Sequence, residues 1–332
     1  MENNEQIKVI IAGKSFGSNY DFLKTELPKI SLEKVELEDL INKAKDAQII
    51  IPAIAKIGEE IYKKASFLRL VQQFGAGLET IDIKSATRYQ VAVANIPTLG
   101  SGNAESVAEW FVMAALGLSR RVCEIRSQVS RGNPWGSPVG QALYGRTAGL
   151  VGFGGIGKAL ARRLKPFQMK IIAIKKNPDK NIEKNLGIEW IGGIKDLPKL
   201  LKQTDYLFIC VPLTVKTRNM IGEKELALLP KGTYILNAAR GPIINKKALI
   251  NTLDSGHLGG VALDVYWTEP PEPNDPILDY TNVMATPHIA GVTDISYSRI
   301  AAGVAENIRR VMEGKLPLNC ANPDLKASWL KK

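Results

Sequence analysis

The chain is poor in several residue types, and each shortage excludes a class of protein. Its 332 residues include three cysteines, Cys123, Cys210 and Cys320, and two histidines. The cysteines are odd in number, far apart and form no CxxC pair, which disfavours a disulfide framework or a zinc site and indicates a reducing compartment. The longest strongly apolar run, Trp110 to Leu118, is about half the length of a membrane-spanning helix. The first residues, MENNEQ, lack the features of a signal peptide. We therefore expect a cytoplasmic protein with no metal and no membrane segment.

The charge of the chain is biased but evenly spread. Forty-four lysines and arginines against 33 acidic residues give a net charge of +11. No arginine-rich segment or basic helix stands out, so nucleic acid is not the expected partner. Attraction of an anionic substrate and cofactor, or simple solubility, explains the excess. Hydrophobic content of 45% and charged content of 23% are ordinary for a globular protein, and the length suits two domains.

Short β-branched runs alternate with helical patterns along the whole chain, which predicts parallel α/β architecture. The first part offers strands at Ile7–Ala12, Ala47–Pro52, Leu68–Phe74 and Val91–Ala94. The second part offers strands at Thr147–Gly152, Lys170–Ile174, Tyr206–Val211, Thr233–Asn237, Gly260–Val265 and Val283–Ala285. Long helices are expected over Ala104–Arg131 and over Ser296–Glu313, the second ended by Gly314.

A glycine-rich turn opens the second set of strands. The stretch GFGGIG, residues 152–157, matches G-x-G-x-x-G and stands between the apolar run TAGLV and the helical pattern KALARRLKPF. In that context the first glycine allows a tight turn, the second lets the backbone approach a pyrophosphate, and the third lets helix pack on strand. The pyrophosphate would rest on the helix N-terminus. Cofactor contacts are therefore expected from Gly152, Gly154, Gly155, Ile156 and Gly157.

Basic residues stand where a dinucleotide-binding unit usually carries an acidic one. Lys175 lies 23 residues after Gly152, at the end of the next strand, and is followed by Lys176 and Asn177. A carboxylate there would bind ribose hydroxyls and repel a 2′-phosphate. A lysine reverses both effects, with a gain on the order of 1–4 kcal/mol for an ammonium near a phosphate. The sequence therefore favours NADP over NAD. Solvated lysines at a strand end are the alternative interpretation.

Three polar side chains follow successive strands at one edge of the second sheet. Arg240 lies in NAARGPIIN, Glu269 in DVYWTEPPEP and His288 in ATPHIAGVT. An arginine binds a carboxylate through a forked contact and can polarise a neighbouring carbonyl. An imidazole can give a proton to that oxygen as hydride reaches the carbon, and a carboxylate against the imidazole orients it. Together they predict reduction of a 2-oxo acid.

At this point the chain resembles the D-isomer-specific 2-hydroxyacid dehydrogenases along almost its whole length. The matching segments are QFGAGLETID, GFGGIGKALARRLKPF, VPLTVKTRNMI, LNAARGPIIN, GGVALDVYWTEP and TPHIAG. The resemblance implies that Arg240, Glu269 and His288 are the catalytic set. It further implies cofactor contacts from Val211, Pro212, Thr217, Ala238, Ala239, Asp264, His288 and Gly291, and substrate contacts from Gly75, Ala76, Gly77 and Arg240. Basic residues like Lys175 and Lys176 are frequent in the family's glyoxylate and hydroxypyruvate reductases, which tilts the expected substrate towards those acids.

Simpler interpretations of some of these residues stay open. Asp264, expected on the nicotinamide amide, could instead cap a turn, and Gly75 and Gly77 could serve a tight turn. Trp135 and Trp267 could wall the substrate pocket, or pack in a core or an interface. The family commonly shows an acidic pair where this chain has Asn245 and Lys246, and that change is expected mainly to add charge.

The resemblance also implies the architecture. Residues 1–103 and 292–332 would form a substrate domain, and residues 104–291 a dinucleotide-binding domain inserted into it. Both would be Rossmann-like or flavodoxin-like α/β domains with parallel sheets, with the substrate in the cleft and hinges near Asn103 and Val292. A homodimer is expected, with the helix from Ala104 and the Trp135 loop as an exchanged arm. A phosphite dehydrogenase of the same family, or a dinucleotide-sensing corepressor on the same fold, are the alternatives to a 2-oxo acid reductase.

Overall fold

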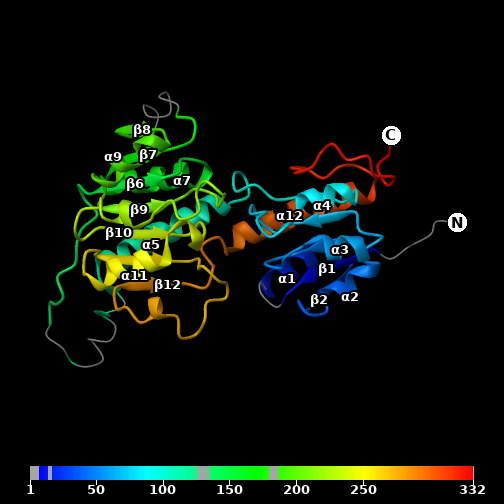
Figure 1. Cartoon of the computed structure of the whole chain (residues 1–332), viewed down its shortest axis with the longest axis horizontal. Coiled ribbons are helices and arrows are strands. Elements are labelled where there is room, and N and C mark those ends of the chain that lie inside the picture. Colours follow the sequence, from blue (N-terminus) through cyan, green and yellow to red (C-terminus); the bar gives the residue numbers. More distant parts are fainter. Residues whose placement is uncertain are drawn as a thin grey trace. The chain divides into compact units, whose positions relative to one another are not determined.

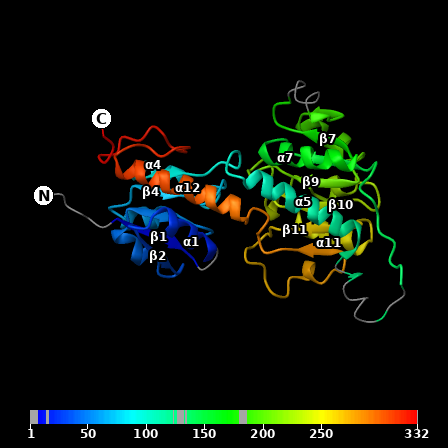
Figure 2. The same cartoon turned by 180° about the vertical axis from the view of Figure 1, so that it is seen from behind.

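The computed structural model describes residues 7–13, 17–122, 124–125, 132, 135–178 and 186–331. The chain divides into two compact units, the first made of Met1–Gly102 with Asp294–Lys332 and the second of Asn103–Thr293. The chain thus leaves the first unit once, builds the whole of the second, and returns with its C-terminal helix (Figures 1 and 2). None of the described helices is long and apolar enough to cross a membrane.

The first unit is a five-stranded parallel sheet covered by helices on both faces. Its strands are β1 (Lys8–Ala12), β2 (Ser31–Val35), β3 (Ile49–Ile51), β4 (Leu70–Gln72) and β5 (Ala92–Ala94), in the spatial order β2-β1-β3-β4-β5. Its helices are α1 (Gly17–Glu26), α2 (Leu40–Lys43), α3 (Glu59–Lys64), α4 (Ile83–Arg88) and α12 (Asp294–Met312). The strand order is that of flavodoxin-like folds.

Alternation along the strands of this unit feeds two separate cores. Ile10 of β1 joins the core that includes Leu40 of α2 and Ile61 of α3. Its neighbours Val9 and Ile11 face the other way and join the core under α1 and α12. A strand that is buried on both faces needs an unbroken apolar run rather than an alternating one. This explains why β1 (KVIIA) and β3 (III) show no polar residue at every second position.

The second unit is a seven-stranded parallel sheet in the order β12-β11-β10-β9-β6-β7-β8. The strands are β6 (Thr147–Val151), β7 (Lys170–Ile174), β8 (Trp190–Gly192), β9 (Tyr206–Ile209), β10 (Tyr234–Asn237), β11 (Gly260–Leu263) and β12 (Val283–Ala285). The strand order reverses between β6 and β9, and an open α/β sheet binds its ligand outside the carboxyl ends of the strands at such a point.

Helices cover both faces of the larger sheet as well. The helices α5 (Asn103–Ser119) and α7 (Gly155–Leu164) pack together over one face, in front of the sheet in Figure 2. The opposite face, towards the viewer in Figure 1, carries α9 (Leu197–Leu201), α10 (Glu223–Leu226) and α11 (Lys246–Asp254). Both units therefore are α/β domains with parallel sheets, as the sequence predicted.

The long helix expected over Ala104–Arg131 is wrong in its extent. The helix α5 ends at Ser119, and Arg121 adopts a left-handed backbone with φ of 56°. The Ser119 hydroxyl bonds the carbonyl of Ala115 and lies 2.8 Å from the Tyr206 hydroxyl, so a tertiary contact fixes the helix end. The last residues of the expected helix, 126–131, lie outside the described part of the chain.

Two strands were missed from the sequence, and both lie at a sheet edge. The strand β2 reads SLEKV and is buried only at Val35, because an edge strand covered on one side needs few apolar residues. The strand β8 has three residues, WIG, too few for any periodicity to be seen.

Candidate active site

The glycine turn joins β6 to α7 at the point where the strand order reverses. Gly152 has φ of 106°, and a Cβ there would lie 2.6 Å from the carbonyl oxygen of Cys210 and 2.8 Å from the Val211 side chain. A Cβ on Gly157 would lie 2.5 Å from the carbonyl oxygen of Gly152. The fold itself therefore requires the first and last glycines, which let β6, β9 and α7 come close together.

Gly154 is different, because a Cβ there would meet no atom of the protein within 4 Å. It is exposed and precedes α7, whose first turn contains Gly155, Ile156 and Gly157. The first N–H groups of a helix lack intrahelical partners and favour an anion. Packing within the protein does not require glycine at 154. The open space there lies next to the first N–H groups of α7, and it fits the pyrophosphate of a dinucleotide.

The expected 2′-phosphate residues follow β7. The Lys175 N–H bonds the carbonyl of Gly192 in β8, which fixes the start of this turn, and the Lys175 side chain is half-buried. Lys176 and Asn177 are exposed. Within the described ranges, no carboxylate forms an ion pair with Lys175 or Lys176.

The loop after β9 is organised by a threonine. The Thr217 hydroxyl donates to the carbonyl of Pro212 at 2.7 Å and accepts from the Thr214 N–H at 2.7 Å. The loop starts at Val211, which touches the glycine turn through Gly152. Thr217 thus shapes the loop that borders the reversal point, and its hydroxyl is used within the loop.

Arg240 is held in the turn after β10. The Asn237 side chain accepts from the Ala239 N–H and donates to the Arg240 carbonyl, both at 3.0 Å, and this closes the turn through Ala238. The guanidinium donates to the Ala239 carbonyl at 2.6 Å. A Cβ on Gly241 would lie 2.2 Å from the Tyr266 carbonyl carbon. Glycine at 241 therefore lets this turn lie directly against the loop after β11, which carries Glu269.

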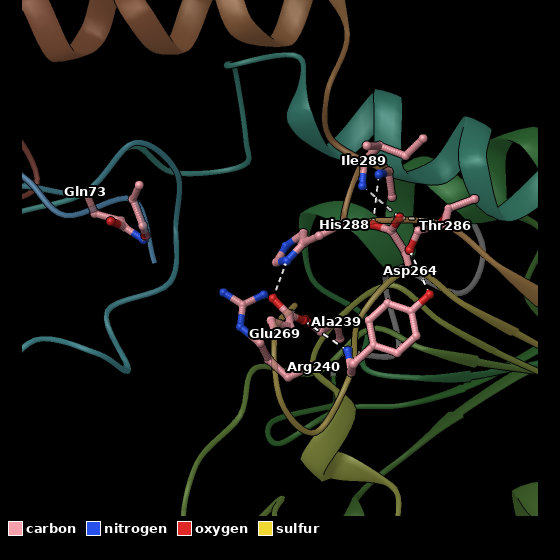
Figure 3. A network of polar contacts seen from close by, with 11 residues as sticks. Gln73, Ala239, Arg240, Asp264, Glu269, Thr286, His288 and Ile289 are labelled. Atoms are coloured by element: carbon pink, nitrogen blue, oxygen red, sulfur yellow. Dashed lines mark hydrogen bonds and ion pairs between the residues drawn. The ribbon is translucent and has the colours of Figure 1, made fainter. Parts of the chain in front are cut away.

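His288 and Glu269 form the central contact (Figure 3). The two atoms His288 Nδ1 and Glu269 Oε2 are 2.7 Å apart, with side chains 34% and 24% exposed. The other carboxylate oxygen accepts the Tyr266 N–H at 3.0 Å. Burial raises the pKa of Glu269, but the hydrogen bond and charge of His288 outweigh it and the pKa is lowered. The carboxylate therefore stays ionised and holds the imidazole through Nδ1.

Asp264, directly after β11, is fully buried at 0% exposure. One of its oxygens accepts the Thr286 hydroxyl at 2.6 Å and the Ile289 N–H at 2.8 Å, and the other accepts the Ala290 N–H at 2.8 Å (Figure 3). Burial raises the pKa of Asp264, and these three donors and His288 oppose that rise. The visible role of Asp264 is to hold the turn that contains His288, while contact with nicotinamide stays a prediction.

The return crossing runs beside the outgoing one. A Cβ on Gly291 would lie 2.3 Å from the Asn103 side-chain nitrogen, and the hydroxyls of Ser106 and Thr293 are 2.8 Å apart. The expected cofactor residue Gly291 therefore lies where the two crossings touch.

The expected substrate loop of the first unit follows β4. Gly75 has φ of 135°, and its carbonyl accepts the Ile96 N–H at 2.9 Å. The Asn95 side chain donates to the Ala76 carbonyl at 2.6 Å. The turn from Gly75 to Gly77 is thus tied at its carbonyls to the segment after β5, and substrate contact by its N–H groups stays a prediction.

The two tryptophans that were candidates for a pocket wall differ. Trp135 is 102% exposed. Trp267 packs on the core of its unit, and its indole N–H donates to the Ile244 carbonyl at 2.7 Å. The Lys246 ammonium lies 5.6 Å from the Trp267 ring centroid and 2.6 Å from Asp275, so Lys246 contacts the loop that carries Glu269 at two places.

Two residues of the site were not singled out from the sequence. They are Thr286, whose hydroxyl donates to Asp264, and Trp110, whose indole N–H donates to that hydroxyl at 3.0 Å. Thr286 stands two residues before His288, and its place in the ATPHIAG segment was a usable signal. Trp110 lies in an apolar helical run, where the sequence gives no sign of a polar role. In the described part of the chain, no three His, Cys, Asp or Glu side chains cluster as a metal would need.

Comparisons with known proteins agree on one family. A family model described as the NAD-binding domain of D-isomer-specific 2-hydroxyacid dehydrogenases matches residues 112–290. The glyoxylate reductase of Korarchaeum cryptofilum is 34% identical over 325 residues, covering 92% of this chain and 96% of that protein. The D-3-phosphoglycerate dehydrogenase of Methanocaldococcus jannaschii is 35% identical over 288 residues, which are 86% of this chain but 53% of that protein.

A solved structure agrees with these sequences. The D-lactate dehydrogenase of Aquifex aeolicus, solved with NAD and lactic acid, has a TM-score of 0.82 at 26% identity and covers 95% of this chain and 99% of its own. The chain belongs to the D-isomer-specific 2-hydroxyacid dehydrogenases and is an NAD(P)-dependent enzyme of that family.

Proposed function

We propose that the enzyme reduces a small 2-oxo acid to the D-2-hydroxy acid, with His288 as the proton donor. The observation that carries this proposal is the 2.7 Å contact between His288 Nδ1 and the ionised Glu269. A nicotinamide cofactor supplies the hydride when bound. Glu269 orients the imidazole through Nδ1, so that Nε2 faces the carbonyl oxygen of the substrate in this proposal and protonates it.

Arg240 binds the substrate in this proposal. Its guanidinium offers a forked set of donors to the carboxylate and polarises the adjacent carbonyl. The backbone N–H groups of Gly75, Ala76 and Gly77 are proposed as further donors to that carboxylate. Residues 1–103 with 292–332 are accordingly proposed as the substrate domain, and residues 104–291 as the cofactor domain.

The proposed cofactor is NADPH, with NADH as the alternative. Support comes from the half-buried Lys175, the exposed Lys176 and Asn177, and the lack of a carboxylate ion pair for either lysine among the described residues. The remaining proposed contacts are the glycine turn with Ile156, and Val211, Pro212, Thr217, Ala238, Ala239, Asp264, His288 and Gly291. Glyoxylate and hydroxypyruvate are the proposed substrates, in keeping with relatives named glyoxylate reductase.

A homodimer through the cofactor domain is also proposed. Several large apolar side chains of that unit are exposed, and a monomer seldom leaves such a set uncovered. They are Met113, Leu116, Val122, Trp135, Val139 and Tyr144. Sedimentation equilibrium would test this: a monomer at micromolar concentration would contradict it. A cytoplasmic location stays a prediction.

One assay tests the reaction, the substrate and the cofactor together. Glyoxylate, hydroxypyruvate, pyruvate and a bulkier 2-oxo acid are reduced with NADPH and with NADH in parallel, and phosphite and formate are offered with the oxidised cofactors. The proposal expects the highest kcat/KM for glyoxylate or hydroxypyruvate with NADPH. An NADH preference above about tenfold would reject the role of the lysines. Turnover of phosphite alone would reject the 2-oxo acid.

A further inference from the structure

A chain of hydrogen bonds runs from the middle of α5 to the turn that carries His288. The Trp110 indole N–H, in a side chain only 6% exposed, donates to the Thr286 hydroxyl oxygen at 3.0 Å. The Thr286 hydroxyl donates to Asp264 at 2.6 Å, and Asp264 accepts the N–H groups of Ile289 and Ala290 (Figure 3). This series of hydrogen bonds connects residues that are 176 positions apart in the sequence.

The chemistry of the groups fixes the direction of this chain. An indole N–H can only donate, and a hydroxyl has one proton with two acceptor lone pairs. With Trp110 as donor on one side, the single Thr286 proton points to the Asp264 carboxylate, which can only accept when ionised. Trp110 therefore sets the orientation of the Thr286 hydroxyl, which in turn is the acceptor for the buried indole N–H.

The chain of hydrogen bonds holds a strained residue in place. His288 has φ of 55°, a left-handed backbone that a residue with a side chain rarely adopts. Such a conformation persists only where its surroundings fix it. On one side, the His288 N–H bonds the Thr286 carbonyl at 3.1 Å. On the other side, the next two N–H groups end on Asp264.

We propose that Trp110 is a positioning residue for His288, acting through Thr286 and Asp264. The inference rests on the proposed role of His288 as proton donor. Loss of the indole N–H frees the Thr286 hydroxyl to rotate, weakens the grip of Asp264 on the turn, and lets His288 relax towards an ordinary backbone. The imidazole then protonates the substrate less often, while the glycine turn that holds the cofactor is unaffected.

The test is a set of substitutions along the chain. Trp110→Phe keeps the aromatic volume and removes the N–H, and Thr286→Val keeps the shape and removes the hydroxyl. The double variant Trp110→Phe/Thr286→Val and the conservative Thr286→Ser complete the set. The matched control is Trp190→Phe, because the Trp190 indole N–H also donates to a side chain, Gln203, at 3.3 Å, but on β8 away from the His288 turn.

The readouts are kcat for reduction, the dinucleotide Kd and Tm. We expect kcat to fall about tenfold in Trp110→Phe and roughly 10–100-fold in Thr286→Val, the effect of leaving a buried acceptor without its donor. The dinucleotide Kd should change by a smaller factor than kcat in each, because the glycine turn proposed to hold the pyrophosphate lies outside this hydrogen-bond chain. The double variant should be no worse than Thr286→Val, because the two groups act in series. The kcat of Thr286→Ser should stay within about threefold of the wild-type kcat, and the kcat of Trp190→Phe should equal that of wild type.

Three results would overturn the inference. They are an unchanged kcat in Trp110→Phe, multiplying losses in the double variant, and a Thr286→Ser as poor as Thr286→Val. Multiplying losses would mean that Trp110 acts through packing alone. Failure of the proposed function is recognised separately, because His288→Ala would then keep its kcat whatever the other variants do.

Discussion

The sharpest prediction concerns the second glycine of the turn, where Gly154→Ala should separate folding from cofactor binding. A Cβ at this position meets no protein atom within 4 Å, and the backbone has negative φ, −92°, so alanine introduces no left-handed strain. The free energy of unfolding should therefore change by less than about 0.5 kcal/mol, as for an ordinary surface substitution.

The same methyl group should disturb the bound dinucleotide. It would occupy the space that the proposed pyrophosphate needs to approach the first N–H groups of α7. Loss of one charge-assisted hydrogen bond costs about 1.5–3 kcal/mol. That loss corresponds to a dinucleotide Kd roughly 10–150-fold weaker.

The assay pairs a titration of reduced-nicotinamide fluorescence with thermal unfolding in the absence of cofactor. Gly152→Ala is the contrasting variant, since its Cβ would lie 2.6 Å from the Cys210 carbonyl oxygen at φ of 106°. That variant should lose stability first. If Gly154→Ala bound dinucleotide as tightly as wild type, the pyrophosphate would not rest at this turn.

Three further predictions concern the proposed catalytic groups. His288→Ala should lower kcat by roughly 10²–10⁴; a normal kcat would remove it from the reaction. Arg240→Lys should lower kcat/KM about 10–100-fold, since an ammonium cannot form the forked contact, and an unaltered KM and kcat would reject the assignment. Glu269 has a lowered pKa, so its stabilising contribution should be complete above the ordinary glutamate value of 4.5 and disappear as the pH falls through the lowered value. The stability difference between wild type and Glu269→Gln in urea should therefore shrink only below that pH, and a constant difference down to about pH 2 would contradict the coupling to His288.

The sequence predicted those parts of the structure whose cause is local. The apolar runs KVIIA and TAGLV indicate buried parallel strands, and GFGGIG between a strand and a helix indicates its turn. The contact of His288 with Glu269 was also predictable, because neighbouring parallel strands place their next residues at the same edge of the sheet. Resemblance to a family then supplied the roles, which stay proposals until they are measured.

The parts that escaped prediction depend on distant residues. No glycine or proline directly follows Ser119 to mark the end of α5, and this end is fixed instead through the Tyr206 hydroxyl. Trp110 stands in an apolar run where any large side chain would fill the core, and its hydrogen bond to Thr286 exists only once α5 packs beside β12. Edge strands such as β2 escaped because half of their surface needs no apolar cover.

The close approach of Gly241 to Tyr266 has a consequence for how the proposed active site would respond to substrate binding. With no side chain to separate them, the turn after β10 lies directly against the backbone at Tyr266, and a shift of one segment is expected to move the other. A ligand that draws the Arg240 guanidinium forward would thereby also carry along the acid that steadies His288. Binding of the substrate by Arg240 and orientation of the proton donor by Glu269 would then be linked through the direct backbone contact that glycine at 241 permits.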